Sequence, residues 1–249
     1  MDKVKPKKHL GQNFLQSEKA LNQILKAADI QPDENVLEIG PGLGVLTKEL
    51  AKKTKNLTTI ELDTDLIPHL QKTLPPHVQI IHQDALKYEP TETNYKIVAN
   101  IPYYITSPLI NHFLQRPNPP KTLTLLVQKE VAEKIVKIDP DMSVLSLQIA
   151  LFGTAKIIAI VPSSAFYPAP KVDSAIIHIE VQNKFPLEKA LEILNLAKKA
   201  FTSKRKKLSN TLKSHAEILA TLNLGDKRPE HLSISDWEKI LILASNPKN

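Results

Sequence analysis

Three of the six glycines in this 249-residue chain lie within five residues, at Gly40, Gly42 and Gly44. They follow an apolar, β-prone segment at 35–39 and precede a segment at 43–53 with the spacing of an amphipathic helix. A glycine loop between a strand and a helix lets the backbone approach a ligand at the carboxyl end of the strand. Val45 stands where the dinucleotide fingerprint has its third glycine, and there is no P-loop motif. The loop predicts an α/β fold with some other ligand, although a tight turn alone can have this pattern.

Short apolar segments recur along the chain up to residue 181, with helix-like segments between them. Most are apolar throughout rather than alternating, which is typical of strands covered on both faces. Their alternation with helices predicts an open, mostly parallel sheet. The proline-rich connection at 162–170 predicts that the last two strands pair antiparallel at one edge. The seven expected strands are 35–39, 57–62, 78–83, 95–100, 122–128, 156–161 and 174–181.

The pattern changes after residue 181, where 182–186 has the character of a linker. Beyond it, apolar residues recur every three or four positions, as on one face of a helix. Ser235 and Glu238 have the spacing of a capping box for a last helix over 236–244. We therefore predict a larger domain over 1–182 and a small all-helical domain over 187–249.

The net charge of +7 is unevenly distributed. Residues 1–10 carry +3 and residues 193–216 carry +7, so the rest of the chain carries −3. Basic clusters on a slightly acidic body favour a partner with a phosphate backbone, because each neutralised phosphate releases counterions. A solvated lysine face is the alternative for either cluster alone. The candidate RNA-binding residues are Lys204, Arg205, Lys206 and Lys207.

Composition excludes several chemistries. The chain has no cysteine, which excludes disulfides, thiolate metal sites and cysteine nucleophiles. Its eight histidines are scattered, and we expect no metal site. No apolar run approaches the ~18–20 residues of a membrane span, and no apolar segment follows the basic start. These features predict a cytoplasmic protein with no membrane contact.

Acidic residues stand at the ends of the first three expected strands. Glu61 lies twenty-one residues after Gly40, where a carboxylate can accept both hydroxyls of a ribose, and Asp84 can accept from an adenine amino group. Glu38 lies behind the glycine loop, where an ammonium group would need a partner. Exposed strand-end acids are the alternative for each residue taken alone. Together they predict a cationic, adenosine-containing ligand, and S-adenosylmethionine fits.

The fourth expected strand ends in Asn100, Ile101, Pro102 and Tyr103. An aromatic exocyclic amine is a poor nucleophile, so a catalyst must hold its two protons with acceptors such as the Asn100 side chain and the Ile101 carbonyl. Tyr103 can stack on the base, and Phe166 can cover the other face of a base removed from its stack. A surface turn is the alternative for the first motif, and a core position for Phe166. No strong general base is needed, because most of the rate gain comes from positioning.

Five motifs follow one another along the chain: GQNFL at 11–15, EIGPGLG at 38–44, NIPY at 100–103, FYPAPKVDS at 166–174 and FTSKRKKL at 201–208. In this order they resemble the small-subunit ribosomal RNA adenine N6,N6-dimethyltransferases, and the resemblance covers nearly the whole chain.

The resemblance implies a class I methyltransferase sheet with a C-terminal helical domain. It implies S-adenosylmethionine as cofactor, and as substrate two adjacent adenosines in a loop near the 3′ end of 16S rRNA, each methylated twice on N6. Nothing in the sequence requires more than a monomer. The implied target-base site is Asn100, Tyr103 and Phe166, and the implied cofactor contacts are Asn13, Leu15, Gly40, Gly42, Glu61, Asp84 and Asn100.

The chain departs from the family pattern at three places. Tyr104 stands where the family usually has Asn, the segment 138–143 is short and lacks glycine, and the basic motif is rich in lysine rather than arginine. Lysine keeps the charge but loses bidentate phosphate geometry. Two alternatives remain: the related 23S rRNA adenine methyltransferases of the macrolide-resistance type, and a non-catalytic ribosome-assembly role.

Overall fold

The computed structural model describes residues 5–137, 141–182 and 184–245. The chain forms two compact units, of which the first comprises Met1–Ala132 and Ala155–Val181 and the second comprises Glu133–Thr154 and Gln182–Asn249. The sequence-based boundary at residue 182 places 133–154 in the first domain, whereas in the structure this segment packs with the C-terminal helices.

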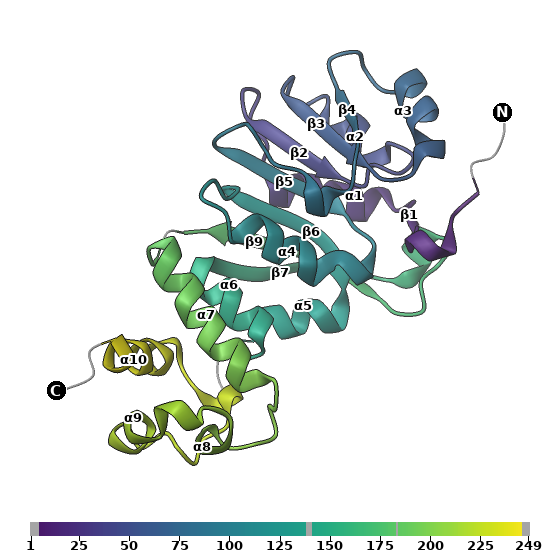
Figure 1. The fold of residues 1–249 in the computed structure, drawn as a ribbon. Helices are drawn as coiled ribbons and strands as arrows, with labels where there is room; N and C mark the ends of the chain where they lie inside the picture. Colours follow the sequence, from purple (N-terminus) through teal and green to yellow (C-terminus); the bar gives the residue numbers. More distant parts are fainter. Residues whose placement is uncertain (1–4, 138–140, 183, 246–249) are drawn as a thin grey trace. The chain divides into compact units, whose positions relative to one another are not determined.

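The first unit is built on a seven-stranded sheet in the order β4-β3-β2-β5-β6-β9-β7 (Figure 1). β4, β3, β2, β5 and β6 run parallel, and β9 pairs antiparallel with β6. The α/β class and the mostly parallel sheet are therefore confirmed. The strands are β2 (Asn35–Ile39), β3 (Leu57–Glu61), β4 (Gln79–His82), β5 (Tyr95–Asn100), β6 (Thr122–Gln128), β7 (Gly153–Val161) and β9 (Ser174–Val181).

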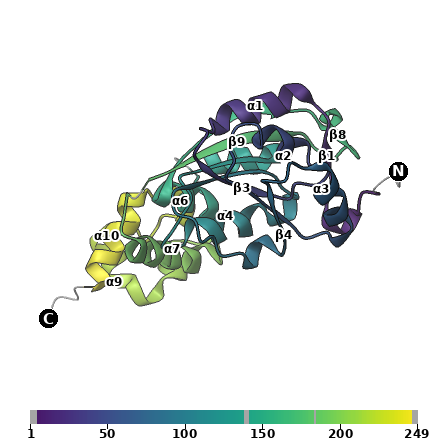
Figure 2. The same cartoon turned by 90° about the horizontal axis from the view of Figure 1, so that it is seen from above.

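Helices cover both faces of this sheet, with α1 on one side and α4 on the other (Figure 2). The helices of this unit are α1 (Glu18–Ala28), α2 (Val45–Leu50), α3 (Ile67–Thr73), α4 (Thr106–Leu114) and the first part of α5 (Lys129–Val136). One apolar core joins α1, α2 and α3 to the sheet, including Ile24, Leu50, Leu70, Val36 and Val98. Burial on both faces explains why the central strands are apolar throughout.

A second, two-stranded sheet lies outside the expected pattern. β1 (Phe14–Leu15) pairs antiparallel with β8 (Phe166–Tyr167), so that Leu15 lies opposite Phe166. Two-residue strands have no periodicity to detect. Their pairing brings the N-terminal segment beside the loop that follows β7.

The second unit is helical, with α6 (Val144–Phe152), α7 (Leu187–Phe201), α8 (Leu208–Thr211), α9 (Ala216–Thr221) and α10 (Ile234–Ser245). Its core includes Leu147, Ile193 and the fully buried Trp237. α6 is buried at every residue from Ser146 to Phe152 and packs against α7 and α10.

The capping prediction for α10 is wrong by two residues. The Asp236 amide donates to the Ser233 hydroxyl at 3.1 Å, and the Ser233 amide donates to the Asp236 carboxylate at 3.0 Å. Ser235 therefore lies inside the helix. Of the 138–143 segment, residues 138–140 lie outside the described part of the chain, and Ser143 caps α6. Among the described residues, no helix is long and apolar enough to cross a membrane.

Candidate active site

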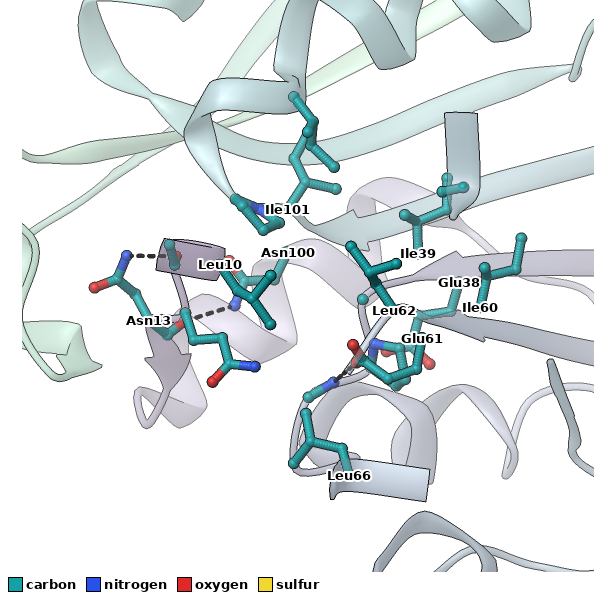
Figure 3. Close-up of a pocket in the computed structure, with 18 of the residues that line it drawn as sticks. Leu10, Asn13, Glu38, Ile39, Ile60, Glu61, Leu62, Leu66, Asn100 and Ile101 are labelled. Atoms are coloured by element: carbon teal, nitrogen blue, oxygen red, sulfur yellow. Dashed lines mark hydrogen bonds between the residues drawn. The ribbon is translucent and has the colours of Figure 1, made fainter. Parts of the chain in front are cut away.

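A pocket lies at the carboxyl edge of the parallel strands of the first unit (Figure 3). Five segments line it: the N-terminal segment 10–15, the end of β2 with the glycine loop, the end of β3, residues 83–86 after β4, and residues 100–105 after β5. The carboxyl ends of parallel strands are where ligands bind in open α/β sheets. Every predicted cofactor residue lines this pocket: Asn13, Leu15, Gly40, Gly42, Glu61, Asp84 and Asn100.

The glycine loop follows β2 in a left-handed conformation, with φ of +58° at Gly42 and +76° at Gly44. A Cβ at Gly42 would lie 3.1 Å from the ring of Phe14, and one at Gly44 would lie 3.0 Å from Leu74. Glycine is required at both positions, because the conformation is strained for other residues and the space is already filled. The ring of Phe14 therefore packs directly against the main chain of Gly42 at the pocket wall.

Glu61 connects the end of β3 to the glycine loop. Its buried carboxylate accepts the Gly42 amide at Oε2 over 3.2 Å and the Asp63 amide at Oε1 over 2.8 Å. Burial raises the pKa of Glu61, and these backbone hydrogen bonds partly oppose the rise. The carboxylate is thus held in one orientation by the main chain before any ligand arrives.

Glu38 is the fully buried acid of the pocket. Its Oε2 has no hydrogen-bond partner among the described residues, and burial raises the pKa of Glu38 to about 8. A buried polar atom without a partner costs free energy that a ligand donor can recover. The residue therefore fits a ligand that carries an ammonium group. Asp84 is half-buried and accepts the Leu86 amide at 2.9 Å, which orders the turn after β4.

The N-terminal segment is fastened to the loop after β3. The Lys7 ammonium donates to Asp63 and to Asp65, each at 2.6 Å, and the Gln12 amide donates to Asp63 at 2.7 Å. Burial by itself would raise the pKa of Asp63, but the hydrogen bonds from Lys7 and Gln12 hold it below its ordinary value. Sequence reasoning missed Lys7, Gln12 and Asp63 as supports of the pocket, because nothing local to them indicates this contact.

Asn100 lies on the opposite side of the pocket from Glu61 (Figure 3). Its Nδ2 donates to the Asn13 carbonyl at 3.2 Å, while the Asn13 side chain donates to the Gly11 carbonyl at 3.1 Å. Ile101, Pro102 and Tyr103 follow in the pocket lining. Burial raises the pKa of the half-buried Tyr103, and its hydrogen bond with Ser174 opposes this rise.

Phe166, the other residue predicted to contact the base, lies outside the lining of this pocket. The ring is only 4% exposed and packs in the apolar core with Leu15. The cause is the β1–β8 pairing, which sets Phe166 opposite Leu15 and leaves the next residue, Tyr167, 60% exposed.

The basic residues 204–207 lie in the second unit between α7 and α8, and all four are exposed. The Lys207 ammonium pairs with Asp226 at 2.7 Å. Within the described ranges, no group of three or more histidine, cysteine or acidic side chains is placed to hold a metal ion.

A doubly wound sheet with such a pocket at its carboxyl edge places the chain among the class I S-adenosylmethionine-dependent methyltransferases. Within that class it belongs to the family described as ribosomal RNA adenine dimethylase, whose model matches residues 3–242. The resemblance found in the sequence motifs is thereby confirmed.

Relatives and solved structures agree with this assignment. The ribosomal RNA small subunit methyltransferase A of Dehalococcoides mccartyi strain BAV1 is 41% identical, with 98% of this chain and 90% of the relative covered. The protein of the same name from Bacillus pumilus is 37% identical, with coverage of 94% and 89%. Among crystal structures, a dimethyladenosine transferase from Plasmodium falciparum superposes with a TM-score of 0.81 at 27% identity over 93% of this chain and 98% of that one. The 23S rRNA methyltransferase ErmE gives 0.74 at 27% identity, with coverage of 92% and 98%.

Proposed function

We propose that this enzyme transfers methyl groups from S-adenosylmethionine to N6 of two adjacent adenosines in a loop near the 3′ end of 16S rRNA, giving N6,N6-dimethyladenosines in the small ribosomal subunit. Family membership and the small-subunit names of its relatives support the substrate. The observation that carries the chemistry is the fixed Asn100 amide at the pocket wall, directly before Ile101, Pro102 and Tyr103.

The pocket residues fit the cofactor by their chemistry. Glu61 would hold the ribose hydroxyls and Asp84 the adenine amino group. Glu38 would hold the ammonium group, because its buried Oε2 has no hydrogen-bond partner among the described residues. Gly40 and Gly42 give backbone access, and Asn13 and Leu15 close the pocket from the N-terminal side. When bound, S-adenosylmethionine supplies an activated methyl group on a sulfonium.

The chain's own part in the reaction is to hold the amine. The Asn100 Nδ2 is engaged with the Asn13 carbonyl, so its Oδ1 is the atom that can accept an N–H of the target amine. The Ile101 carbonyl accepts the second N–H, and the ring of Tyr103 stacks on the base. Positioning of this kind accounts for most of the barrier reduction when the methyl donor is already activated. Phe166 is buried and lies opposite Leu15 in the β1–β8 pair.

The helical unit supplies affinity for the RNA backbone through the exposed residues 204–207. A single-stranded loop suits a protein that binds the base in one unit and the backbone in the other, because its bases can be turned out into a pocket while cations hold the phosphates. We further propose that the protein acts in the cytoplasm as a monomer.

A 23S rRNA adenine methyltransferase is the second candidate, because ErmE shares the fold with a TM-score of 0.74. The test is methyl transfer from radiolabelled S-adenosylmethionine to small and large subunits that lack the relevant modifications, with digestion and mapping by mass. Dimethyladenosine at paired sites in 16S rRNA supports the proposal, and label in 23S rRNA replaces it with the second candidate. No label in either, with cofactor binding confirmed separately, indicates a non-catalytic role. The Asn100→Ala variant is the control for catalysis: it should transfer little or no label to either subunit.

A further inference from the structure

The side chain of Tyr103 is tied to a residue that the proposed mechanism does not use. The Tyr103 phenol and the Ser174 hydroxyl lie 2.7 Å apart, within hydrogen-bond distance, although 71 residues separate them in the chain. Tyr103 begins the short turn of helix after β5, and Ser174 is the first residue of β9. The bond therefore joins the turn after β5 to the start of β9, at the carboxyl end of the parallel strands.

Ser174 is a rigid partner. It is fully buried and lies opposite Gln128 in the antiparallel β6–β9 pair. The preceding residue, Asp173, is held at two atoms: its carbonyl accepts the Lys129 amide and its carboxylate accepts the Ser163 amide, each at 3.0 Å. The position of the Ser174 hydroxyl is thus set by the sheet and by the loop after β7.

Tyr103 is less constrained by packing. Its side chain is half-buried and lines the pocket from a turn rather than from a strand. The phenol oxygen of a tyrosine lies on the rotation axis of the ring, so a hydrogen bond at this atom fixes the first side-chain torsion and hence the place of the ring. In the described structure, Ser174 provides that bond.

We infer that Ser174 is a positioning residue for this enzyme: its hydroxyl holds the Tyr103 phenol oxygen in place, and with it the ring that stacks on the purine base. The inference rests on the proposed function, since it needs Tyr103 to contact the base. Ser174 itself touches neither substrate nor cofactor and acts only through Tyr103. Loss of the bond lets the ring swing away from this place, so the reaction slows while cofactor binding is kept.

The test is a double-mutant cycle with Ser174→Ala and Tyr103→Phe, read as kcat and KM for methyl transfer to unmodified small subunits. A hydrogen bond of ordinary strength predicts about a fivefold loss of kcat for each single variant. The double variant should lose no more than either single variant, because both remove the same bond. The dissociation constant for S-adenosylmethionine should stay within about twofold of wild type by calorimetry.

The matched control is Tyr95→Phe, which removes a phenol at the other end of β5, where it donates to the Asn118 carbonyl at 3.3 Å. Its effect on kcat should be small and should add to that of Ser174→Ala. A second readout is the ring resonance of Tyr103 in the spectrum of ring-labelled tyrosine, assigned by its loss in Tyr103→Phe. Ser174→Ala should shift this resonance and leave that of Tyr95 unchanged.

Two failures can be told apart. Wild-type protein that transfers no methyl group to either subunit refutes the proposed function and the inference with it. Active wild-type protein together with an unchanged kcat in Ser174→Ala, or with losses that add in the double variant, refutes the inference alone.

Discussion

Replacement of Glu38 by glutamine should stabilise the ligand-free protein and weaken its cofactor site at the same time. The Glu38 carboxyl is fully buried without a partner at Oε2 among the described residues, and burial raises its pKa from 4.5 to about 8. The neighbouring Thr47 hydroxyl opposes this rise in pKa, and charge repulsion from nearby Glu61 adds to it. Between pH 4.5 and pH 8 the folded chain therefore keeps a proton that the unfolded chain has released.

The sign and size of the effect follow from proton linkage. Where the folded state binds more protons, the free energy of unfolding falls as pH rises, by about 1.4 kcal/mol for each pH unit. From pH 4.5 to pH 7 this amounts to roughly 3 kcal/mol of lost stability. Glutamine has nearly the same shape and no titration, so Glu38→Gln should be more stable than wild type by about this amount at pH 7 and equal to it near pH 4.

The affinity for the cofactor should rise with pH, whereas the stability of the wild-type protein falls. An ammonium group favours the ionised carboxylate, so wild-type affinity should rise with pH up to about 8 and binding below that pH should release a proton. Glu38→Gln should bind at least about tenfold more weakly and show neither effect.

Scanning calorimetry at pH 5 and pH 7.5 measures the stability, and titration calorimetry in buffers of different ionisation enthalpy measures the released proton. Equal stability of the two proteins at both pH values would refute the burial argument. An unchanged affinity would show that Glu38 does not face the ammonium group.

Three further changes test the rest of the site. Gly42→Ala should lower cofactor affinity about tenfold, because the residue has φ of +58° and its Cβ would meet Phe14 at 3.1 Å; calorimetry measures this, and Gly225→Ala, whose Cβ meets only Ser209 at an ordinary 3.8 Å, should not change it. Asp63→Asn should speed hydrogen exchange over residues 7–15 and weaken cofactor binding severalfold, whereas Asp226→Asn breaks an exposed ion pair in the other unit and should do neither. Unchanged exchange in Asp63→Asn would show that Lys7 does not fasten this segment. Alanine at all four residues 204–207 should weaken RNA binding and lower the slope of its salt dependence by about 3, as measured by filter binding over a salt series. An unchanged slope would make this cluster a solvated face.

Local sequence patterns were sufficient to predict the strands of the seven-stranded sheet. Each expected strand corresponds to a strand of the structure, and the first, fourth, fifth and seventh match it residue for residue. Buried parallel strands are apolar throughout, and that signal is contained within a few residues. The final helix shows the limit of such reasoning. Ser233 with Asp236 and Ser235 with Glu238 have the same capping spacing, and only the first pair forms the hydrogen bonds.

The site was predictable where parallel topology brings residues together. Glu61 and Asn100 end β3 and β5, Asp84 lies just after β4, and the carboxyl ends of parallel strands in one sheet share an edge. Phe166 could not be placed this way, because its burial depends on pairing with Leu15, about 150 residues earlier. No periodicity marks that contact.

The N-terminal segment connects the two halves of the pocket. At Gln12 it binds Asp63, whose amide in turn binds the Glu61 carboxylate beneath the glycine loop. One residue later, the Asn13 carbonyl accepts Asn100 Nδ2 on the side where the target amine is proposed to bind. Adjacent residues of one segment are thus linked through Asp63 to the acid that would hold the cofactor ribose, and directly to the amide that would hold the substrate. A disturbance of this segment should therefore reach both affinity for S-adenosylmethionine and turnover, whereas loss of the Tyr103–Ser174 bond should reach turnover alone.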